Sequence, residues 1–270
     1  MISSIRQSML NMAFKCGESF RRRYVEGQII PPGIAAGRGT GLHHANKVNL
    51  TQKITSGVDL PIGDIKDAAR DGFVKAFRDG VYIPKHLLSE KDKLINMGLE
   101  DSLRCAEVYH EKIAPEILPR AVEEPFHLEV GLSLPIEGTL DIQRLGKVDD
   151  LKTAAKKWSE GQIHKEIQPV MYSYSHEKVT GIRPLFKYHI MIARRGQAGN
   201  ATSAGYDTQE KTCTDQDYSS LFANLHIFID MLEKGVFTPS NPTAWWCSAD
   251  WCGYFSTCPF RGNGKQQAWF

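Results

Sequence analysis

The sequence lacks a long apolar run, a strong excess of either charge and any low-complexity stretch. A membrane-spanning helix needs about 18 consecutive apolar residues. The best candidate, residues 221–232, is interrupted by Asn224, His226 and Asp230. The 33 basic and 31 acidic residues nearly cancel, and 41% of the chain is hydrophobic, whereas a disordered chain would be less apolar and more unevenly charged. The 270 residues are therefore expected to form one large globular domain or two small ones.

Several functional signatures are also missing. Gly264 and Lys265 are followed by Gln266, so no phosphate-binding loop of a nucleotide-driven motor is present. There is no nucleophile elbow of the kind that serine hydrolases use. The first 15 residues contain no apolar segment followed by a small-residue cleavage site, which predicts a cytoplasmic protein rather than a secreted one.

The six cysteines include no closely spaced pair of the C-x-x-C type. Cytoplasmic thiols stay reduced, so a cluster of cysteines indicates a metal or catalysis before a disulfide. Cys247, Cys252 and Cys258 lie together in an aromatic C-terminal tail, and Cys16 lies near the N-terminus. Four thiolates can hold zinc or an iron–sulfur cluster, and buried cysteines without metal are the alternative.

The hydrophobic pattern predicts an α/β core preceded by a helical segment. Helices are expected at 1–24, 62–79, 90–117, 161–176 and 216–234. Three antiparallel strands are expected at 127–130, 138–145 and 147–151, and a buried strand at 185–193. Residues 196–215 are polar and rich in glycine and serine, which predicts a long loop, and 238–242 form a linker. We therefore expect segments 1–30, 31–122, 123–240 and 241–270, with 28–240 as one compact domain in the alternative division.

A predicted hairpin with acidic side chains contains the candidate catalytic residues. A two-residue turn at Leu145 and Gly146 would place Asp141 directly opposite Asp150, and Lys152 would share their face of the sheet. Adjacent carboxylates repel each other unless a cation lies between them, and Mg²⁺ or Mn²⁺ prefers such oxygen ligands. A nearby lysine can polarise a water molecule, so the pattern fits metal-assisted hydrolysis of a phosphodiester. A solvated hairpin, in which Lys152 only pairs with an acid, is the alternative.

Four motifs, two of them within this hairpin, follow one another in a recognisable order. The motifs are Gly39-Thr40-Gly41-Leu42-His43, then Gly138 with Asp141, then Asp150 with Lys152 and Thr153, then Gln168 with Tyr172. Together, over positions 39–172, they resemble the RecB-like branch of the PD-(D/E)XK nuclease superfamily. Leu140 departs from the pattern, because the name of the superfamily places proline there.

The resemblance implies a PD-(D/E)XK nuclease core, a mixed central sheet flanked by helices, with an inserted helical segment. It also implies roles for individual residues. The ligands of Mg²⁺ or Mn²⁺ would be His43, Asp141, Asp150 and the Leu151 carbonyl. Lys152 would orient or activate the attacking water, and Gln168 and Tyr172 would steady the active site or the DNA backbone. An ordinary histidine is the alternative for His43. Glu129 is a lesser candidate for an additional acid near the metal.

The cysteines extend the resemblance over nearly the whole chain. In AddB-type and CRISPR-adaptation nucleases of this superfamily, one N-terminal and three C-terminal cysteines bind a [4Fe–4S] cluster. The resemblance thus implies that Cys16, Cys247, Cys252 and Cys258 bind such a cluster and close the tail onto the N-terminus, with zinc as the lesser alternative. Neither of the other two cysteines is expected to bind metal. Cys105 lies in a predicted helix and should be buried, and Cys213 lies in the predicted loop and should be a free thiol.

The expected function is metal-dependent cleavage of DNA. The resemblance implies an exonuclease that processes DNA ends in recombination, repair or phage DNA metabolism, in a bacterial or phage-infected cytosol. A non-catalytic iron–sulfur DNA-binding protein and an endonuclease or CRISPR-adaptation-type end trimmer are the alternatives. Single-stranded DNA or duplex ends would be the substrate. A helicase or recombinase partner and a homo-oligomer stay open, and no membrane is expected.

Basic and aromatic residues supply candidates for contacts with DNA. The candidates are Arg21, Arg22 and Arg23, Arg194 and Arg195, and Arg261 with Lys265. The tryptophans of the tail, Trp245, Trp246 and Trp251, could stack on bases. Burial of at least two of them around the cysteines is the favoured alternative.

Overall fold

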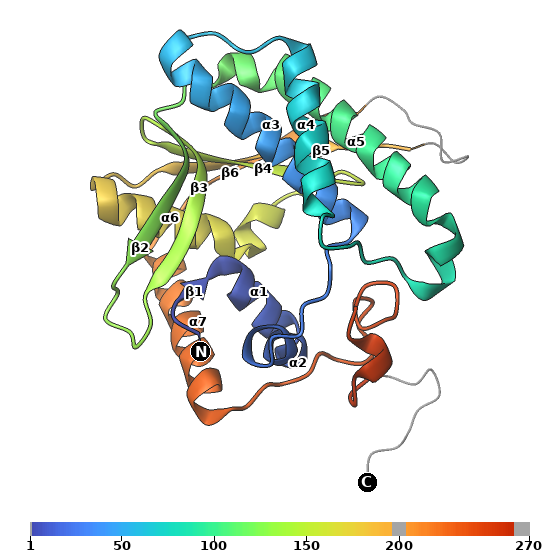
Figure 1. The fold of residues 1–270 in the computed structure, drawn as a ribbon. Coiled ribbons are helices and arrows are strands. Elements are labelled where there is room, and N and C mark those ends of the chain that lie inside the picture. Colours follow the sequence, from blue (N-terminus) through green and yellow to red (C-terminus); the bar gives the residue numbers. More distant parts are fainter. Residues whose placement is uncertain (1, 196–203, 262–270) are drawn as a thin grey trace.

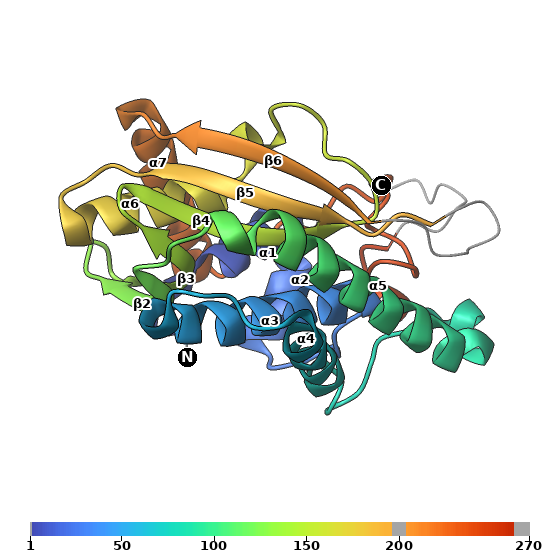
Figure 2. The ribbon, with the colours of Figure 1, turned by 90° about the horizontal axis from the view of Figure 1, so that it is seen from above.

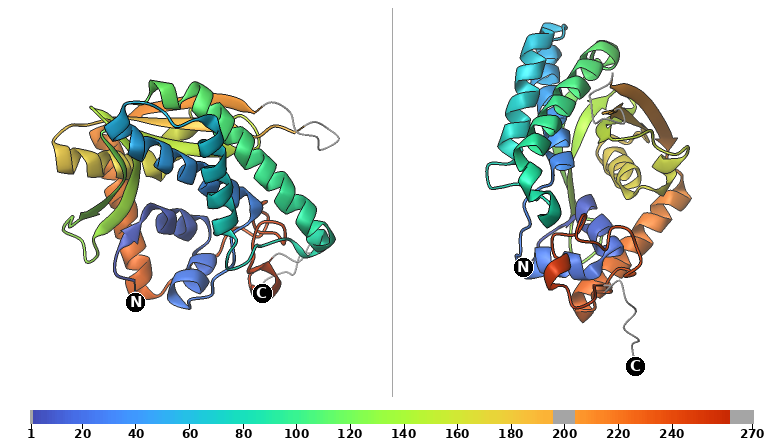
Figure 3. Two further views of the ribbon diagram at one scale, coloured as in Figure 1. Left: turned by 45° about the horizontal axis from the view of Figure 1, so that its top comes forward. Right: turned by 90° about the vertical axis from the view of Figure 1, so that its right-hand side faces the viewer.

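A computed structural model describes residues 2–195 and 204–261. A mixed six-stranded sheet lies between two helical layers (Figures 1 and 3). One layer contains α3 (Ile34–Ser56), α4 (Ile62–Ala76) and α5 (Lys91–Lys112), and the other contains α1 (Gln7–Lys15), α6 (Ile167–Thr180) and α7 (Asp215–Lys234). The expected mixed sheet flanked by helices is thereby confirmed. No helix in these two ranges combines the length and apolar character needed to cross a membrane.

The strands follow the order β1-β3-β4-β5-β6, and β2 also pairs with β3. Their bounds are β1 Ile5–Arg6, β2 Ala121–Leu128, β3 Ile136–Arg144, β4 Lys147–Ala154, β5 Leu185–Ile192 and β6 Gly205–Thr212. Strands β2, β3 and β4 form the expected antiparallel meander. Strand β5 is parallel to β4 because α6 provides the crossover between them, as Figure 2 shows.

The turn between β3 and β4 has the predicted form. Arg144 pairs with Lys147, so Leu145 and Gly146 make a two-residue turn, and Gly146 has the positive φ of 66° that such a turn requires. The next pairs are Gln143 with Val148 and Ile142 with Asp149. Continued by one residue, this register places Asp141 opposite Asp150.

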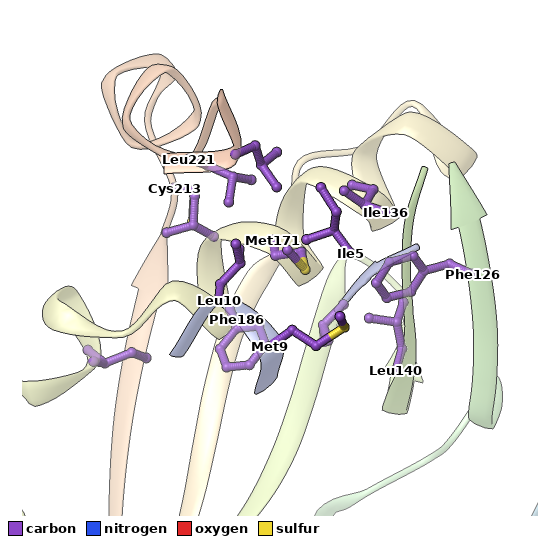
Figure 4. Close-up of a cluster of buried hydrophobic side chains, with 14 of the residues drawn as sticks. Ile5, Met9, Leu10, Phe126, Ile136, Leu140, Met171, Phe186, Cys213 and Leu221 are labelled. Atoms are coloured by element: carbon purple, nitrogen blue, oxygen red, sulfur yellow. The ribbon is translucent and has the colours of Figure 1, made fainter. Parts of the chain in front are cut away.

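Two hydrophobic cores lie on the two faces of the sheet. The core beneath α1, α6 and α7 contains Ile5, Leu10, Met171 and Phe186 (Figure 4). The core beneath α3, α4 and α5 contains Leu42, Leu50, Tyr109, Leu151 and Met191. Helix α1 thus lies on the same side of the sheet as α6, whose Gln168 contacts Asp150.

The predicted loop at 196–215 is wrong in its second half, which forms β6. The strand pairs with β5 over its whole length, from Gly205 opposite Ile192 to Thr212 opposite Leu185. Its polar composition resembles a loop because it is an edge strand with a solvent-facing side. Cys213 follows it and is a free thiol, as expected, but it is buried and its sulfur lies 3.7 Å from the Pro169 carbonyl oxygen. Residues 196–203 of the expected loop lie outside the described residues.

Other element bounds also differ from those expected. The N-terminal helix is broken at Cys16, which is extended between α1 and α2 (Gly17–Phe20), and a π-helical turn follows (Arg21–Val25). The helix expected at 161–176 begins instead at Ile167, after the 3₁₀ turn Gln162–Lys165, and the first strand of the meander begins at Ala121 rather than at 127. Further 3₁₀ turns are Lys85–Glu90, Ala114–Glu116 and Phe255–Thr257.

Candidate active site

Four elements bring the expected active-site side chains together. These are α3 with His43, β3 with Asp141, β4 with Asp150 and Lys152, and α6 with Gln168 and Tyr172. His43 Nδ1 lies 3.0 Å from Asp141 Oδ2, and Lys152 Nζ lies 2.5 Å from Asp150 Oδ2. The Leu151 amide faces Asp141 Oδ2 at 3.5 Å, which ties the two strands together at this point.

The glycines before His43 allow α3 to approach its neighbours closely. A Cβ atom on Gly41 would lie 2.4 Å from Ser102 Oγ and 2.6 Å from the Ala69 carbonyl oxygen, so only glycine fits between α4 and α5 there. A Cβ on Gly39 would lie 3.9 Å from Thr153 Oγ1 at the end of β4. The glycine pattern therefore serves close packing, and this packing carries His43 to the hairpin.

Gln168 fixes the orientation of Asp150. Its Nε2 donates a hydrogen bond to Asp150 Oδ1 at 2.6 Å, and its Oε1 accepts one from the Tyr188 hydroxyl at 3.3 Å. Asp150 is 1% exposed, so its carboxylate cannot be reoriented by bulk water. The ammonium group of Lys152 also lies 5.1 Å from the centre of the Tyr188 ring, which limits where it can move.

Phe126 explains why a glycine occupies position 138. A Cβ atom at Gly138 would lie 2.5 Å from the Phe126 ring, which is too close, and 3.4 Å from the Tyr172 ring, which is an ordinary contact. The two rings pack edge to face with centroids 5.7 Å apart. The glycine of the G-x-x-D motif thus makes room for Phe126, which in turn packs on the tyrosine of the Q-x-x-x-Y motif.

His43 and Asp141 form a charged pair. Burial alone would lower the pKa of His43, but the Asp141 carboxylate, assisted by Asp150, raises it to about 9. Burial would raise the pKa of Asp141, but His43 and then Lys152 bring it below its usual value. An imidazolium therefore neutralises Asp141 at neutral pH, in the place where a divalent cation could do the same.

Asp150 has the opposite shift. Burial and the repulsion from Asp141 raise its pKa to about 7, although Lys152 and His43 oppose this. Two carboxylates on opposed strands thus have pKa values displaced in opposite directions. This separation is typical of a site that handles protons or holds a cation.

Glu123 also lies at this site, and sequence reasoning missed it. Its carboxylate, the His43 imidazole and the Asp141 carboxylate each place a ligand atom within 4.8 Å of the other two. Burial and the nearby Asp141 raise the pKa of Glu123. Glu129, considered in its place, is exposed and lies 3.2 Å from His127 Nε2 instead, away from this group.

A groove of about 680 Å³ opens beside the hairpin. Arg6, Gln7 and Ser8, at the start of α1, line one part of it, and Asp141 and Tyr172 line another. The first backbone amides of a helix and an exposed arginine favour an anion. The groove therefore joins a surface suited to phosphate with the acidic hairpin.

The C-terminal tail packs against the N-terminal helices. Figure 1 shows it close to α1 and α2. The Gly17 amide donates to the Thr238 carbonyl oxygen at 2.7 Å, and the Ser240 amide lies 3.4 Å from Cys16 Sγ. Arg22 donates to Thr257 Oγ1 at 2.8 Å. The four cysteines proposed as cluster ligands are thus on segments that lie side by side.

The basic candidates are mostly engaged within the protein. Arg22 is buried on Glu18 at 2.7 Å, Arg21 also binds Glu18, and Arg195 binds Asp101 at 2.6 Å. The Glu18 pairs are local to one helical turn, whereas the Arg195 pair joins residues far apart in the sequence. Arg23 lies over the Tyr24 ring, while Arg194 is exposed beside the start of β6.

The tryptophans of the tail are more exposed than expected. Trp245 and Trp251 are 61% and 65% exposed, and their rings contact each other at 4.9 Å. Trp246 is half-buried and donates its indole N–H to Ser240 Oγ at 2.7 Å. Burial of at least two tryptophans around the cysteines is therefore wrong, because the Trp245 and Trp251 rings pack on each other and leave most of their surface exposed. Lys265 lies outside the described residues.

Comparison with known proteins gives a similarity of fold. No protein-family model and no curated protein matches the chain. The fold is similar to the crystal structure of a protein described as a "putative exonuclease" from Eubacterium rectale, with a TM-score of 0.54 and 13% sequence identity. The similarity covers 98% of this chain and 91% of the other. At this identity it establishes a shared fold and no more.

Proposed function

We propose that this protein is a Mg²⁺- or Mn²⁺-dependent deoxyribonuclease of the RecB-like PD-(D/E)XK type that degrades DNA from its ends. The observation that carries the proposal is the meeting of His43, Asp141, Asp150 and Lys152, from three elements, within one hairpin and its neighbouring helix. Nuclease motifs distributed over more than a hundred residues would have no physical reason to converge in an unrelated protein. The shared fold with the Eubacterium rectale protein is consistent with the proposal.

The donor atoms suit a hard divalent cation. His43, Asp141, Asp150 and the Leu151 carbonyl would hold it, since they combine one imidazole with oxygen ligands. When bound, the cation supplies a Lewis acid that activates water and neutralises charge on the phosphate. Asp150 and His43 must release their protons to become ligands, and their raised pKa values show that this site holds protons in the absence of metal.

The remaining residues orient the reaction. Lys152 lies next to Asp150 and can donate a hydrogen bond to a water or to a phosphate oxygen on this face of β4. Gln168 keeps the Asp150 carboxylate in one orientation through its amide N–H groups. Tyr172 lines the groove beside Asp141, where a DNA strand can approach the hairpin.

A digestion experiment tests the function. End-labelled linear and circular DNA, single- and double-stranded, would be incubated with the protein with and without Mg²⁺ or Mn²⁺. We expect metal-dependent loss of linear DNA and survival of circles, and at least a hundredfold slower digestion by Lys152→Ala. Lys147→Ala, an exposed lysine on the same strand, is the matched control and should digest normally. Equal digestion by both variants would refute the assignment, and binding without cutting would favour the non-catalytic alternative.

We also propose that Cys16, Cys247, Cys252 and Cys258 bind a [4Fe–4S] cluster that joins the two ends of the chain. The packing of the tail on α1 and α2 supports this, as do the soft thiol ligands. Protein purified without oxygen should be brown and contain iron, and Cys16→Ser should lose both. Cys213→Ala, which removes a thiol far from this group, should retain them. Colourless protein with bound zinc would replace the cluster by a zinc site.

A further inference from the structure

Glu123 lies directly across the sheet from Asp141. Its neighbours pair in regular register, Val122 with Ile142 and Glu124 with Leu140, so Glu123 falls opposite Asp141 between them. Glu123 is also the only non-glycine residue of the described chain with a positive φ, at 53°. Such a conformation is strained in a non-glycine residue.

The strand pair changes face at this position. Leu140 belongs to the core beneath α1 and α6, whereas Ile142, two residues later, belongs to the core beneath α3 and α5. In a regular strand, residues two apart share a face. The unusual backbone of Glu123 therefore accompanies a local twist of β2 and β3 that brings both acidic side chains toward His43.

The Glu123 carboxylate is half-buried and has no partner of its own. Among the described residues, no hydrogen bond or ion pair holds it, although His43 and Asp141 place ligand atoms within 4.8 Å. A half-buried carboxylate beside another carboxylate is unfavourable unless a cation compensates it. A divalent cation beside neutral His43 would balance the charges of Glu123 and Asp141, while Lys152 pairs with Asp150.

We propose that Glu123 is a ligand of the divalent cation, together with His43 and Asp141. This inference rests on the proposed function, because it assigns a further residue to the same metal site. The mixed nitrogen and oxygen donors favour Mn²⁺ over Mg²⁺, since imidazole suits transition metals. Glutamine has nearly the size and shape of glutamate. Glu123→Gln therefore tests the charge of the side chain and its strength as a metal ligand.

The test measures Mn²⁺ binding to the full-length protein, from the loss of the free-ion paramagnetic resonance signal. We expect Glu123→Gln to bind Mn²⁺ about 10- to 100-fold more weakly, the range found when metal-site residues are replaced. Glu124→Gln is the matched control, because this adjacent exposed glutamate points to Gln143. Its affinity should equal that of the parent.

A second variant separates the ligand role from a structural one. Glu123→Gly accepts the positive φ without strain, so its thermal unfolding midpoint without metal should equal or exceed that of the parent. Its Mn²⁺ affinity should nevertheless fall as in Glu123→Gln. Unchanged affinity in both variants, with a parent that binds Mn²⁺ and cleaves DNA, would overturn this inference alone. A parent that binds no Mn²⁺ would overturn the metal-dependent function as well.

Discussion

Asp149 and Asp150 are adjacent in sequence, but their carboxylates lie on opposite faces of β4. Asp149 is fully buried on the α3 and α5 side, where it accepts hydrogen bonds from Arg144 at 2.6 and 2.7 Å and contacts His189 Nε2 at 3.0 Å. Asp150 faces Lys152 and α6. Because strand side chains alternate, the doublet supplies one structural acid and one acid for the candidate active site.

Replacing each acid by asparagine should therefore have different effects. Asp149→Asn leaves Arg144 and His189 without their anion and should destabilise the protein by about 3–5 kcal/mol. Asp150→Asn resembles the protonated acid that burial already favours, so the metal-free protein should keep or gain stability. Its nuclease activity should fall at least a hundredfold. Denaturant unfolding and digestion of labelled DNA would measure both, and equal destabilisation by the two variants would contradict this division.

Local features could be predicted for the hairpin because they depend on neighbouring residues. The turn at Leu145 and Gly146 sets the register, and alternation then places Asp150 and Lys152 on one face. Gln168 and Tyr172 are four residues apart in sequence, so their shared helix side follows from helix geometry. These relations need no knowledge of the tertiary structure.

Glu123 could not be predicted in this way. Its position depends on the pairing of β2 with β3 across residues 129–135, which contain no regular turn, and on a positive φ that local preferences assign to glycine. The prediction of a loop in place of strand β6 was wrong for a related reason. Its polar residues pair with β5 at an edge, and composition alone does not distinguish such a strand from a loop.

The pKa of Asp150 predicts a pH dependence of stability in metal-free protein. Between its ordinary value near 4 and its folded value of about 7, the folded state holds a proton that the unfolded state has released. The free energy of unfolding therefore falls as pH rises through this range. Asp150→Asn lacks this titration, so its stability relative to the parent should increase from pH 4 to 7. Unfolding curves recorded with a chelator would show it, and a constant difference would contradict it.

Gly138 gives a test of the close packing of β3 against Phe126. Gly138→Ala would place a methyl group 2.5 Å from the Phe126 ring and displace it or Tyr172. We expect a loss of about 1–3 kcal/mol in stability, as for other overpacked cores, together with slower digestion. Gly63→Ala, in α4 with no atom within 4 Å of the added methyl, is the control and should be neutral or slightly stabilising. Equal stability of both variants would contradict the packing argument.

The groove beside Asp141 predicts where a DNA strand binds. Arg6 has a 63% exposed side chain, and its only ion pair among the described residues is with Glu137 at 3.3 Å, which leaves it able to contact phosphate. In a Lys152→Ala background, which prevents digestion, Arg6→Ala should weaken binding of single-stranded DNA and lower the salt slope by about 1. Arg70→Ala removes the same charge from α4, in the helical layer on the other side of the sheet, and should change neither quantity. Fluorescence anisotropy at several salt concentrations measures both, and the same slope in both variants would place the strand outside this groove.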